Sequence, residues 1–275
     1  MPFIETADNA RIFYEDLGSG PPLVFVHGWS MSGRAWRFQA EPFAAAGYRV
    51  VVPDLRGHGQ STAPGGLVML PACGADLVTL FAKLELSGVV LIGWSLGALV
   101  SLAAFPRLSS DLKGMILVGG TPRFTATEGY SHGVPPTEPK GMGVRLRRDF
   151  RKTMGEFFRG MFAAGELSRQ QENRIAREII MGGRLPDPEV ALSTLAILAS
   201  ADLRAGLGAV DLPVMLLHGS LDTVCPVAAA RYMAEQIPGA ELELMDGCGH
   251  APFMSHPEEF NRRLGGFLER VDDRH

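Results

Sequence analysis

The sequence predicts an α/β fold, with a mostly parallel, doubly wound sheet and an inserted helical cap, and two observations support this prediction. Short apolar runs bounded by turn residues alternate with stretches of helical length along the first half of the chain. After residue 121 this alternation stops, and only helical patterns follow until strand patterns resume beyond residue 206. We therefore expect a core domain formed by 1–121 and 206–275, with 122–205 as a cap, or lid.

Apart from 241–245, the predicted strands are apolar runs, which is typical of parallel strands that are covered on both faces. They are 23–26, 50–52, 89–92, 115–118, 214–217 and 241–245. An earlier pair, 3–5 and 11–15, lies on either side of Asp8-Asn9 and indicates a hairpin at an antiparallel edge. The predicted helices are 35–46, 71–86 and 98–105 in the core, 144–162, 168–181 and 188–199 in the cap, and an amphipathic 257–270.

The uncharged stretch from Gly88 to Phe105 has the length of a membrane span. Its interior, Gly93-Trp94-Ser95-Leu96-Gly97, favours another interpretation. A buried strand, a sharp turn and a buried helix placed end to end produce the same hydropathy. We therefore expect no membrane association.

The formal net charge of −4 and the pI of about 6.0 argue against a protein that neutralises nucleic-acid phosphates. The charge is also uneven. Residues 122–200 hold 12 basic and 9 acidic side chains, so the rest of the chain holds 14 of the 26 basic and 21 of the 30 acidic ones. The predicted cap is therefore net positive and the predicted core net negative, and this asymmetry bears on which partner the cap could bind.

Three cysteines, Cys73, Cys225 and Cys248, are a sparse and odd set that suits a reducing compartment better than a disulfide framework. The first residues show no basic start followed by an apolar run, so we expect no signal peptide. Both observations predict a cytoplasmic protein.

The motif Gly93-Trp94-Ser95-Leu96-Gly97 follows one predicted strand and precedes a predicted helix, which is the context that a G-x-S-x-G nucleophile turn requires. The turn is tight, so small residues are needed two positions either side of Ser95. Free backbone N–H groups at the start of the helix favour the oxyanion that forms when an acyl carbonyl is attacked. Ser95 is therefore the candidate nucleophile.

A serine nucleophile needs a base, and in this topology the base follows a late strand. His250, in Gly247-Cys248-Gly249-His250, meets that requirement. The other histidines are better explained otherwise, because they precede Ser95, end a strand, begin the last helix, or lie in the cap or at the terminus: His27, His58, His218, His256, His132 and His275.

The third member of the triad is expected after the strand 214–217, where Gly219-Ser220-Leu221-Asp222 supplies a carboxylate. A buried carboxylate that accepts the imidazole N–H fixes the tautomer and stabilises the imidazolium. Asp246 is the rival, but its place at the end of a strand favours a turn residue. The chain order is then Ser95, Asp222, His250.

The oxyanion hole is expected from the backbone N–H groups of Leu96 and Trp29. Trp29 follows the strand that ends at Val26-His27-Gly28, and Gly28 allows the backbone to approach the substrate closely.

Four separated motifs together resemble the α/β-hydrolase superfamily: His27-Gly28-Trp29, Asp54-Leu55-Arg56-Gly57-His58-Gly59-Gln60-Ser61, Gly93-Trp94-Ser95-Leu96-Gly97 and Gly249-His250. The chain is most similar to the pimeloyl-acyl-carrier-protein methyl ester esterases of biotin synthesis. That likeness includes Asp202-Leu203-Arg204 and the run from His250 to Phe260, whereas the cap does not match clearly. The resemblance implies an α/β-hydrolase fold and hydrolysis of a methyl ester of pimeloyl-carrier protein, with release of methanol.

An ester on an acidic carrier protein implies a basic contact surface on the cap. The segment Val144–Lys152 offers five positive charges around Asp149 as carrier-protein contacts: Arg145, Arg147, Arg148, Arg151 and Lys152. Arg145, Arg148 and Lys152 have helical spacing and would share one face of a single helix. A solvated helix face is the alternative explanation.

Aromatic residues indicate the substrate pocket. Trp94, next to the nucleophile, borders the acyl pocket in this family, and Trp29 lies on the oxyanion loop. Phe150, Phe157, Phe158, Met161 and Phe162 recur at near-helical spacing, as in a lid over an acyl tunnel or in an ordinary core face.

We expect ester hydrolysis through an acyl-enzyme, with no metal and no organic cofactor. A general carboxylesterase or thioesterase, a lipase, a peptidase, a carbon–carbon bond hydrolase and a perhydrolase remain open, because one triad can serve all of them. Ser95 argues against dehalogenases and epoxide hydrolases, which place Asp there, and the intact triad argues against a non-catalytic binding protein.

Overall fold

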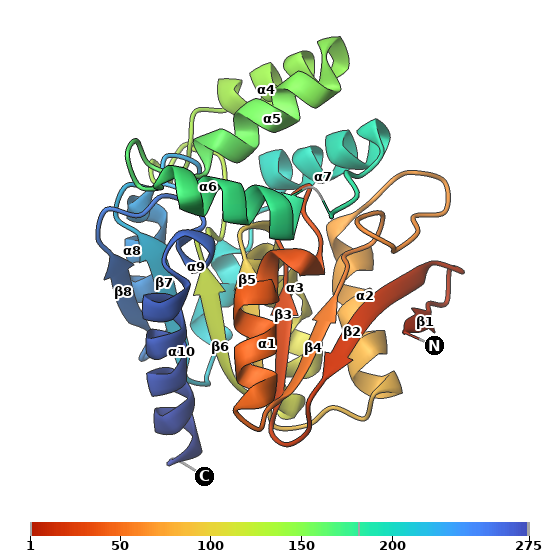
Figure 1. Ribbon diagram of the computed structural model, residues 1–275, viewed down its shortest axis with the longest axis vertical. Coiled ribbons are helices and arrows are strands. Elements are labelled where there is room, and N and C mark those ends of the chain that lie inside the picture. Colours follow the sequence, from red (N-terminus) through yellow and green to blue (C-terminus); the bar gives the residue numbers. More distant parts are fainter. Residues whose placement is uncertain (1, 181, 274–275) are drawn as a thin grey trace.

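The protein forms an eight-stranded sheet with the strand order β1-β2-β4-β3-β5-β6-β7-β8, in a computed structural model that describes residues 2–180 and 182–273 (Figure 1). β1 and β2 pair antiparallel with each other, β2 pairs antiparallel with β4, and the remaining pairs are parallel. The strands are β1 (Phe3–Glu5), β2 (Arg11–Leu17), β3 (Pro22–Val26), β4 (Arg49–Pro53), β5 (Val89–Trp94), β6 (Leu112–Val118), β7 (Val214–Gly219) and β8 (Glu241–Met245). The mostly parallel sheet and its antiparallel edge are thus confirmed.

The sheet is buried on both faces, because successive residues of its apolar strands point into different cores. In β5, Leu91 packs in one core, and Val90 and Ile92 pack in the other. The first core also contains residues of α2 (Leu70–Lys83), α3 (Leu96–Leu108) and α8 (Val227–Gln236), and the second contains residues of α1 (Arg37–Ala45), α9 (Pro252–Ser255) and α10 (Pro257–Asp272). Figure 1 shows α1 and α2 on opposite faces of the sheet. The result is the three-layer arrangement of a doubly wound fold.

The apolar stretch 88–105 is divided between β5 and α3, which meet at Ser95. Within residues 2–180 and 182–273, the structure has no helix with the length and apolar character needed to cross a membrane.

The described residues between β6 and β7 form four α-helices, which lie above the end of the sheet (Figure 1). These helices are α4 (Thr137–Arg148), α5 (Phe150–Gly160), α6 (Arg169–Ile175) and α7 (Pro188–Ser200), and a π-helical turn, η3 (Ala176–Ile180), continues α6. Met181, the last residue of the predicted helix 168–181, lies outside the described residues. Short 3₁₀ turns complete the structure at η1 (Gly33–Trp36), η2 (Ser109–Asp111) and η4 (Arg204–Ala209).

The predicted single helix over 144–162 is wrong, because the chain breaks at Asp149 into α4 and α5. Asp149 is extended, with φ −154° and ψ 91°, and its carboxylate accepts the backbone N–H of Lys152 at 3.0 Å. Asp is favoured at such an N-cap position and competes there with continued helix. Arg145 and Arg148 therefore belong to α4 and Lys152 to α5, and the three do not share one helix face.

Candidate active site

Ser95 lies in the tight turn between β5 and α3. Its backbone has φ 55° and ψ −113°, a conformation that costs a residue with a side chain free energy. A Cβ atom at Gly97 would collide with the Val26 carbonyl oxygen, and one at Gly93 would collide with the Ser101 hydroxyl. The turn therefore closes only with small residues at these two positions, as the motif predicts.

Asp222 and His250 come together from the loops that follow β7 and β8. Asp222 Oδ2 lies 2.8 Å from His250 Nδ1, and both side chains are buried. Asp222 Oδ1 accepts the backbone N–H groups of Val224 and Cys225 at 2.8 and 2.9 Å. The carboxylate is thereby fixed on one side by the backbone, and its other oxygen faces the imidazole.

Asp222 keeps its charge in this buried place. Burial alone would raise the pKa of Asp222, but the neighbouring charge of His250 and hydrogen bonds from His218 and His250 outweigh it and hold the pKa below its usual value. An ionised Asp222 can stabilise a protonated His250.

His250 and Ser95 are held at the end of β6. The Ser95 N–H donates to the carbonyl of Val118, the last residue of β6, at 2.9 Å. Gly119, which follows Val118, lies against the His250 ring, and a Cβ atom on Gly119 would be 3.0 Å from His250 Nδ1. His250 Nε2 is buried and has no hydrogen-bond partner among the described residues. This nitrogen is free to accept a proton from a nucleophile.

Cys225 is a buried cysteine whose backbone N–H donates to Asp222, so its thiol has to be considered beside Ser95 as a nucleophile. Burial, followed by the charge of Asp222, raises the pKa of Cys225 well above its usual value. The thiol therefore stays protonated and is a poor rival to Ser95 as a nucleophile.

A further histidine, His218 at the end of β7, contacts the same carboxylate. Its Nε2 lies 3.1 Å from Asp222 Oδ2 and 2.8 Å from the Cys225 carbonyl oxygen. The sequence pattern alone does not predict a role for His218 in the site. Its position near the end of β7, four residues before Asp222 in the following loop, is the signal that points to it.

The other described histidines lie outside the triad. His27 and His58 are fully buried, and burial lowers their pKa values to about 4 and about 3. The His27 ring is fixed by the Gly28 carbonyl and the Leu55 N–H, both at 2.8 Å. His132 packs against Tyr130, and His275 lies outside the described residues.

The backbone beside Ser95 offers two N–H groups that could stabilise an oxyanion. Leu96 begins α3, and the chain at Gly28 and Trp29 passes so close to Ser95 that a Cβ on Gly28 would lie 3.2 Å from that of Ser95. Neither the Trp29 nor the Leu96 N–H donates to an acceptor within the described part of the chain. These are the two donors expected from the sequence.

A cavity of about 180 Å³ opens on Ser95 between the core and the cap. Of the predicted substrate-binding residues, Trp29 and Phe157 line it, with their rings edge to face at 4.9 Å. The cavity also has two charged residues of α4, Glu138 and Arg145. An apolar pocket with a few polar groups is typical of small-molecule sites.

Trp94, Phe150 and Phe158 do not line this cavity within the described structure, so their part in substrate binding stays a prediction. The Trp94 ring is buried beneath the site, where its Nε1 donates to the His250 carbonyl at 2.9 Å. Phe158 lines a second cavity, of about 450 Å³, inside the cap. Phe150, in the first turn of α5, packs against the core.

The five basic residues predicted to contact a carrier are exposed and lie around the break between α4 and α5: Arg145, Arg147, Arg148, Arg151 and Lys152. None of them forms an ion pair with a described carboxylate. Arg151 and Lys152 stand in the first turn of α5, where the helix dipole disfavours positive charge. Helix stability therefore does not explain their presence.

Comparisons with known proteins agree with this arrangement. The family model described as alpha/beta hydrolase fold matches residues 21–257. The chain is 33% identical over 261 residues to a pimeloyl-[acyl-carrier protein] methyl ester esterase from Chromobacterium violaceum, covering 94% of this chain and 98% of that protein. The structure is similar to an esterase from Exiguobacterium antarcticum, with a TM-score of 0.89, 28% identity and coverage of 97% and 98%. A bromoperoxidase from Bacillus anthracis gives a TM-score of 0.85 and 28% identity, with coverage of 95% and 96%.

Proposed function

Because the chain belongs to the α/β-hydrolase fold family, and to its carboxylic ester hydrolases, we propose that it hydrolyses the methyl ester of a pimeloyl chain carried on acyl-carrier protein. The observation that carries this proposal is the identity of 33% to an esterase of that name over nearly the whole of both chains. The exposed basic residues around the α4–α5 break support an acidic carrier as the partner.

In the proposed reaction, Ser95 Oγ attacks the ester carbonyl carbon while His250 Nε2 accepts the hydroxyl proton. Asp222 stabilises the imidazolium, and the N–H groups of Trp29 and Leu96 stabilise the oxyanion. The tetrahedral intermediate collapses, the carbon–oxygen bond to the methoxy group breaks, and the proton on His250 passes to methanol. Water, activated by His250, then hydrolyses the acyl-enzyme and releases the free carboxylate and Ser95.

The proposed site needs no metal or organic cofactor for these steps. We also propose that the protein acts in the cytoplasm, because its three cysteines are free and buried, which suits a reducing compartment.

Ser95→Ala tests the catalytic assignment. It removes the nucleophile, so methanol release from the carrier-linked methyl ester should fall by about 10³-fold or more while the far-UV circular dichroism stays unchanged. The wild-type gene should restore growth without biotin to cells that lack their own esterase, and the variant gene should not. Turnover by folded Ser95→Ala at more than a tenth of the wild-type rate would contradict the triad.

The double variant Arg147→Glu/Arg148→Glu tests the partner. Because steering by charge depends on complementary surfaces, KM for the carrier-linked ester should rise roughly tenfold at low ionic strength, and the effect should fade with added salt. The matched control is Arg107→Glu/Arg231→Glu, which changes the net charge equally at exposed positions of α3 and α8. Equal effects of the cap variant on a small soluble methyl ester would contradict carrier recruitment.

A further inference from the structure

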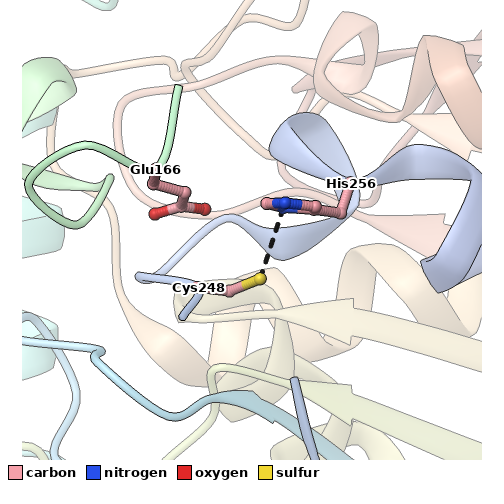
Figure 2. A group of neighbouring side chains, drawn as sticks. All are labelled: Glu166, Cys248 and His256. Atoms are coloured by element: carbon pink, nitrogen blue, oxygen red, sulfur yellow. Dashed lines mark hydrogen bonds between the residues drawn. The ribbon is translucent and has the colours of Figure 1, made fainter. Parts of the chain in front are cut away.

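A second group of chemically reactive side chains lies outside the triad, where the cap meets the loop that carries His250. It consists of Glu166, Cys248 and His256 (Figure 2). Glu166 precedes α6 in the cap, Cys248 follows β8, and His256 stands between α9 and α10. Two parts of the chain that are far apart in the sequence thus meet here: Glu166 comes from the cap, whereas Cys248 and His256 are eight residues apart near the C-terminal end of the core.

The three side chains converge. Their ligand atoms all lie within 4.8 Å of one another, and Cys248 Sγ is 3.3 Å from His256 Nδ1. Figure 2 shows the carboxylate, the thiol and the imidazole around a common space. Cys248 is buried, whereas Glu166 and His256 are partly exposed, so an ion has a way in from solvent.

Only one of the two carboxylate oxygens of Glu166 accepts hydrogen bonds from the described residues. Its Oε2 accepts the backbone N–H groups of Ala163 and Gly249, at 2.6 and 2.8 Å. Its Oε1 is buried and has no hydrogen-bond partner within the described residues. A buried carboxylate oxygen without a partner is costly, and a cation in the common space would satisfy it.

The donor set fits zinc better than calcium or magnesium, because it contains an imidazole and a cysteine sulfur, whose thiol proton is released when the metal binds. Zinc binds Cys sulfur at about 2.3 Å and His nitrogen or carboxylate oxygen at about 2.0 to 2.2 Å, so donors around a tetrahedral ion lie about 3.4 Å apart. The 3.3 Å between Cys248 Sγ and His256 Nδ1 already matches this value, and a carboxylate oxygen within 4.8 Å of both would have to approach by about 1.4 Å at most.

We propose that Glu166, Cys248 and His256 bind a zinc ion, with water in the fourth position, and that the ion fastens the cap to the loop carrying His250. This loop already depends on the cap, since the His250 N–H donates to the Met161 carbonyl at 2.6 Å and the Gly249 N–H donates to Glu166. The site is separate from the proposed reaction, for which the sequence predicts no metal.

Zinc titration of the metal-free full-length protein tests the site, monitored by calorimetry or by competition with a chromophoric chelator. The wild type should bind one zinc ion, and Cys248→Ser, His256→Gln and Glu166→Gln should each weaken that binding at least tenfold. The controls Cys73→Ser and His132→Gln, which change a cysteine and a histidine outside the cluster, should bind as the wild type does.

X-ray absorption by the zinc-loaded wild type provides a test that needs no variant to fold. It should show one sulfur ligand at about 2.3 Å together with nitrogen and oxygen ligands. Zinc should also raise the melting temperature of the wild type and leave that of folded Cys248→Ser unchanged. A zinc spectrum without sulfur, equally tight binding by Cys248→Ser, or no binding by the wild type would each overturn the proposal.

Discussion

At the residue scale, Asp222 is the most heavily engaged side chain of the site. Its four partners are two backbone N–H groups and two histidine rings, and it lies fully buried among them. The second ring, His218, faces the same oxygen as His250. We infer that His218 is a positioning residue, which holds the carboxylate in the plane that His250 requires.

His218→Phe should lower kcat by about 10- to 100-fold, because a hydrogen bond to a charged group contributes about 1.5 to 3 kcal/mol. Without this donor, Asp222 presents more negative charge to His250 and favours its protonated form. The pH at which kcat/KM is half-maximal should therefore move upward.

The rescue variant is His218→Gln, whose amide N–H can take the place of Nε2–H and should recover most of the lost rate. The substitution His132→Gln, at a partly exposed histidine outside the site, serves as the control. An unshifted pH profile in His218→Phe, or no rescue by Gln, would leave His218 with a purely structural role.

The candidate triad was predictable from the sequence because each member follows a strand of a parallel sheet, and the carboxyl ends of such strands meet at one edge. Asp222 and His250 lie as predicted, at 2.8 Å. Of the aromatic residues expected in the pocket, only Trp29 and Phe157 line the cavity at Ser95. Whether Phe157 or Phe158 faces Ser95 depends on how α5 is rotated against the core, and the sequence does not define that rotation.

At the element scale, the break between α4 and α5 decides which cap residues reach the site. Apolar residues keep near-helical spacing across Asp149, so periodicity predicted one helix there. In the structure, α4 ends at Arg148, and Asp149 caps the start of α5, which is therefore a separate helix. As a result, Phe157 of α5 and Arg145 of α4 both line the cavity at Ser95.

Asp149→Ala should destabilise α5 by about 0.5 to 2 kcal/mol, because the first turn of the helix loses its side-chain acceptor. Amide hydrogen exchange across Phe150–Gly160 should become faster, while the amides of β5 and β6 keep their protection. Glu156→Ala is the matched control, since Glu156 is an exposed acid on the same helix that caps nothing. Unchanged exchange in α5 would contradict the capping role.

At the scale of the whole molecule, the fold was predictable because the sheet is buried on both faces. Strands such as β5 are apolar at every position, and this pattern together with the alternating helices leaves few topologies. The family comparison confirms the fold. The sequence pattern did not show how many polar side chains the core contains, among them the neighbouring rings of His27 and His58, whose centroids are 5.3 Å apart.

These two histidines make the stability of the protein sensitive to acid. Burial lowers the pKa of His27 to about 4, and burial together with the charge of His27 lowers that of His58 to about 3, whereas both titrate near 6.5 in an unfolded chain. Between pH 6.5 and 4 the unfolded state therefore binds protons that the folded state does not. The free energy of unfolding should fall as the pH falls, by at most about 1.4 kcal/mol per pH unit for each histidine.

Urea denaturation at several pH values between 7 and 4 measures this slope. His58→Gln, which lacks the titrating ring, should flatten the profile, and His132→Gln should leave it as in the wild type. A profile of equal slope in His58→Gln would show that the acid sensitivity arises elsewhere.

The hydrogen bonds from Gly249 and His250 to the cap also bear on how this scaffold can be re-engineered. The cap occupies one continuous stretch of chain, so it could be replaced by the cap of a related hydrolase in order to change the substrate specificity. Here a grafted cap would also have to supply the Met161 carbonyl and the Glu166 carboxylate in register. Without them, a chimaera would gain a new substrate pocket but lose the hydrogen bonds that hold the loop carrying His250, its proposed general base.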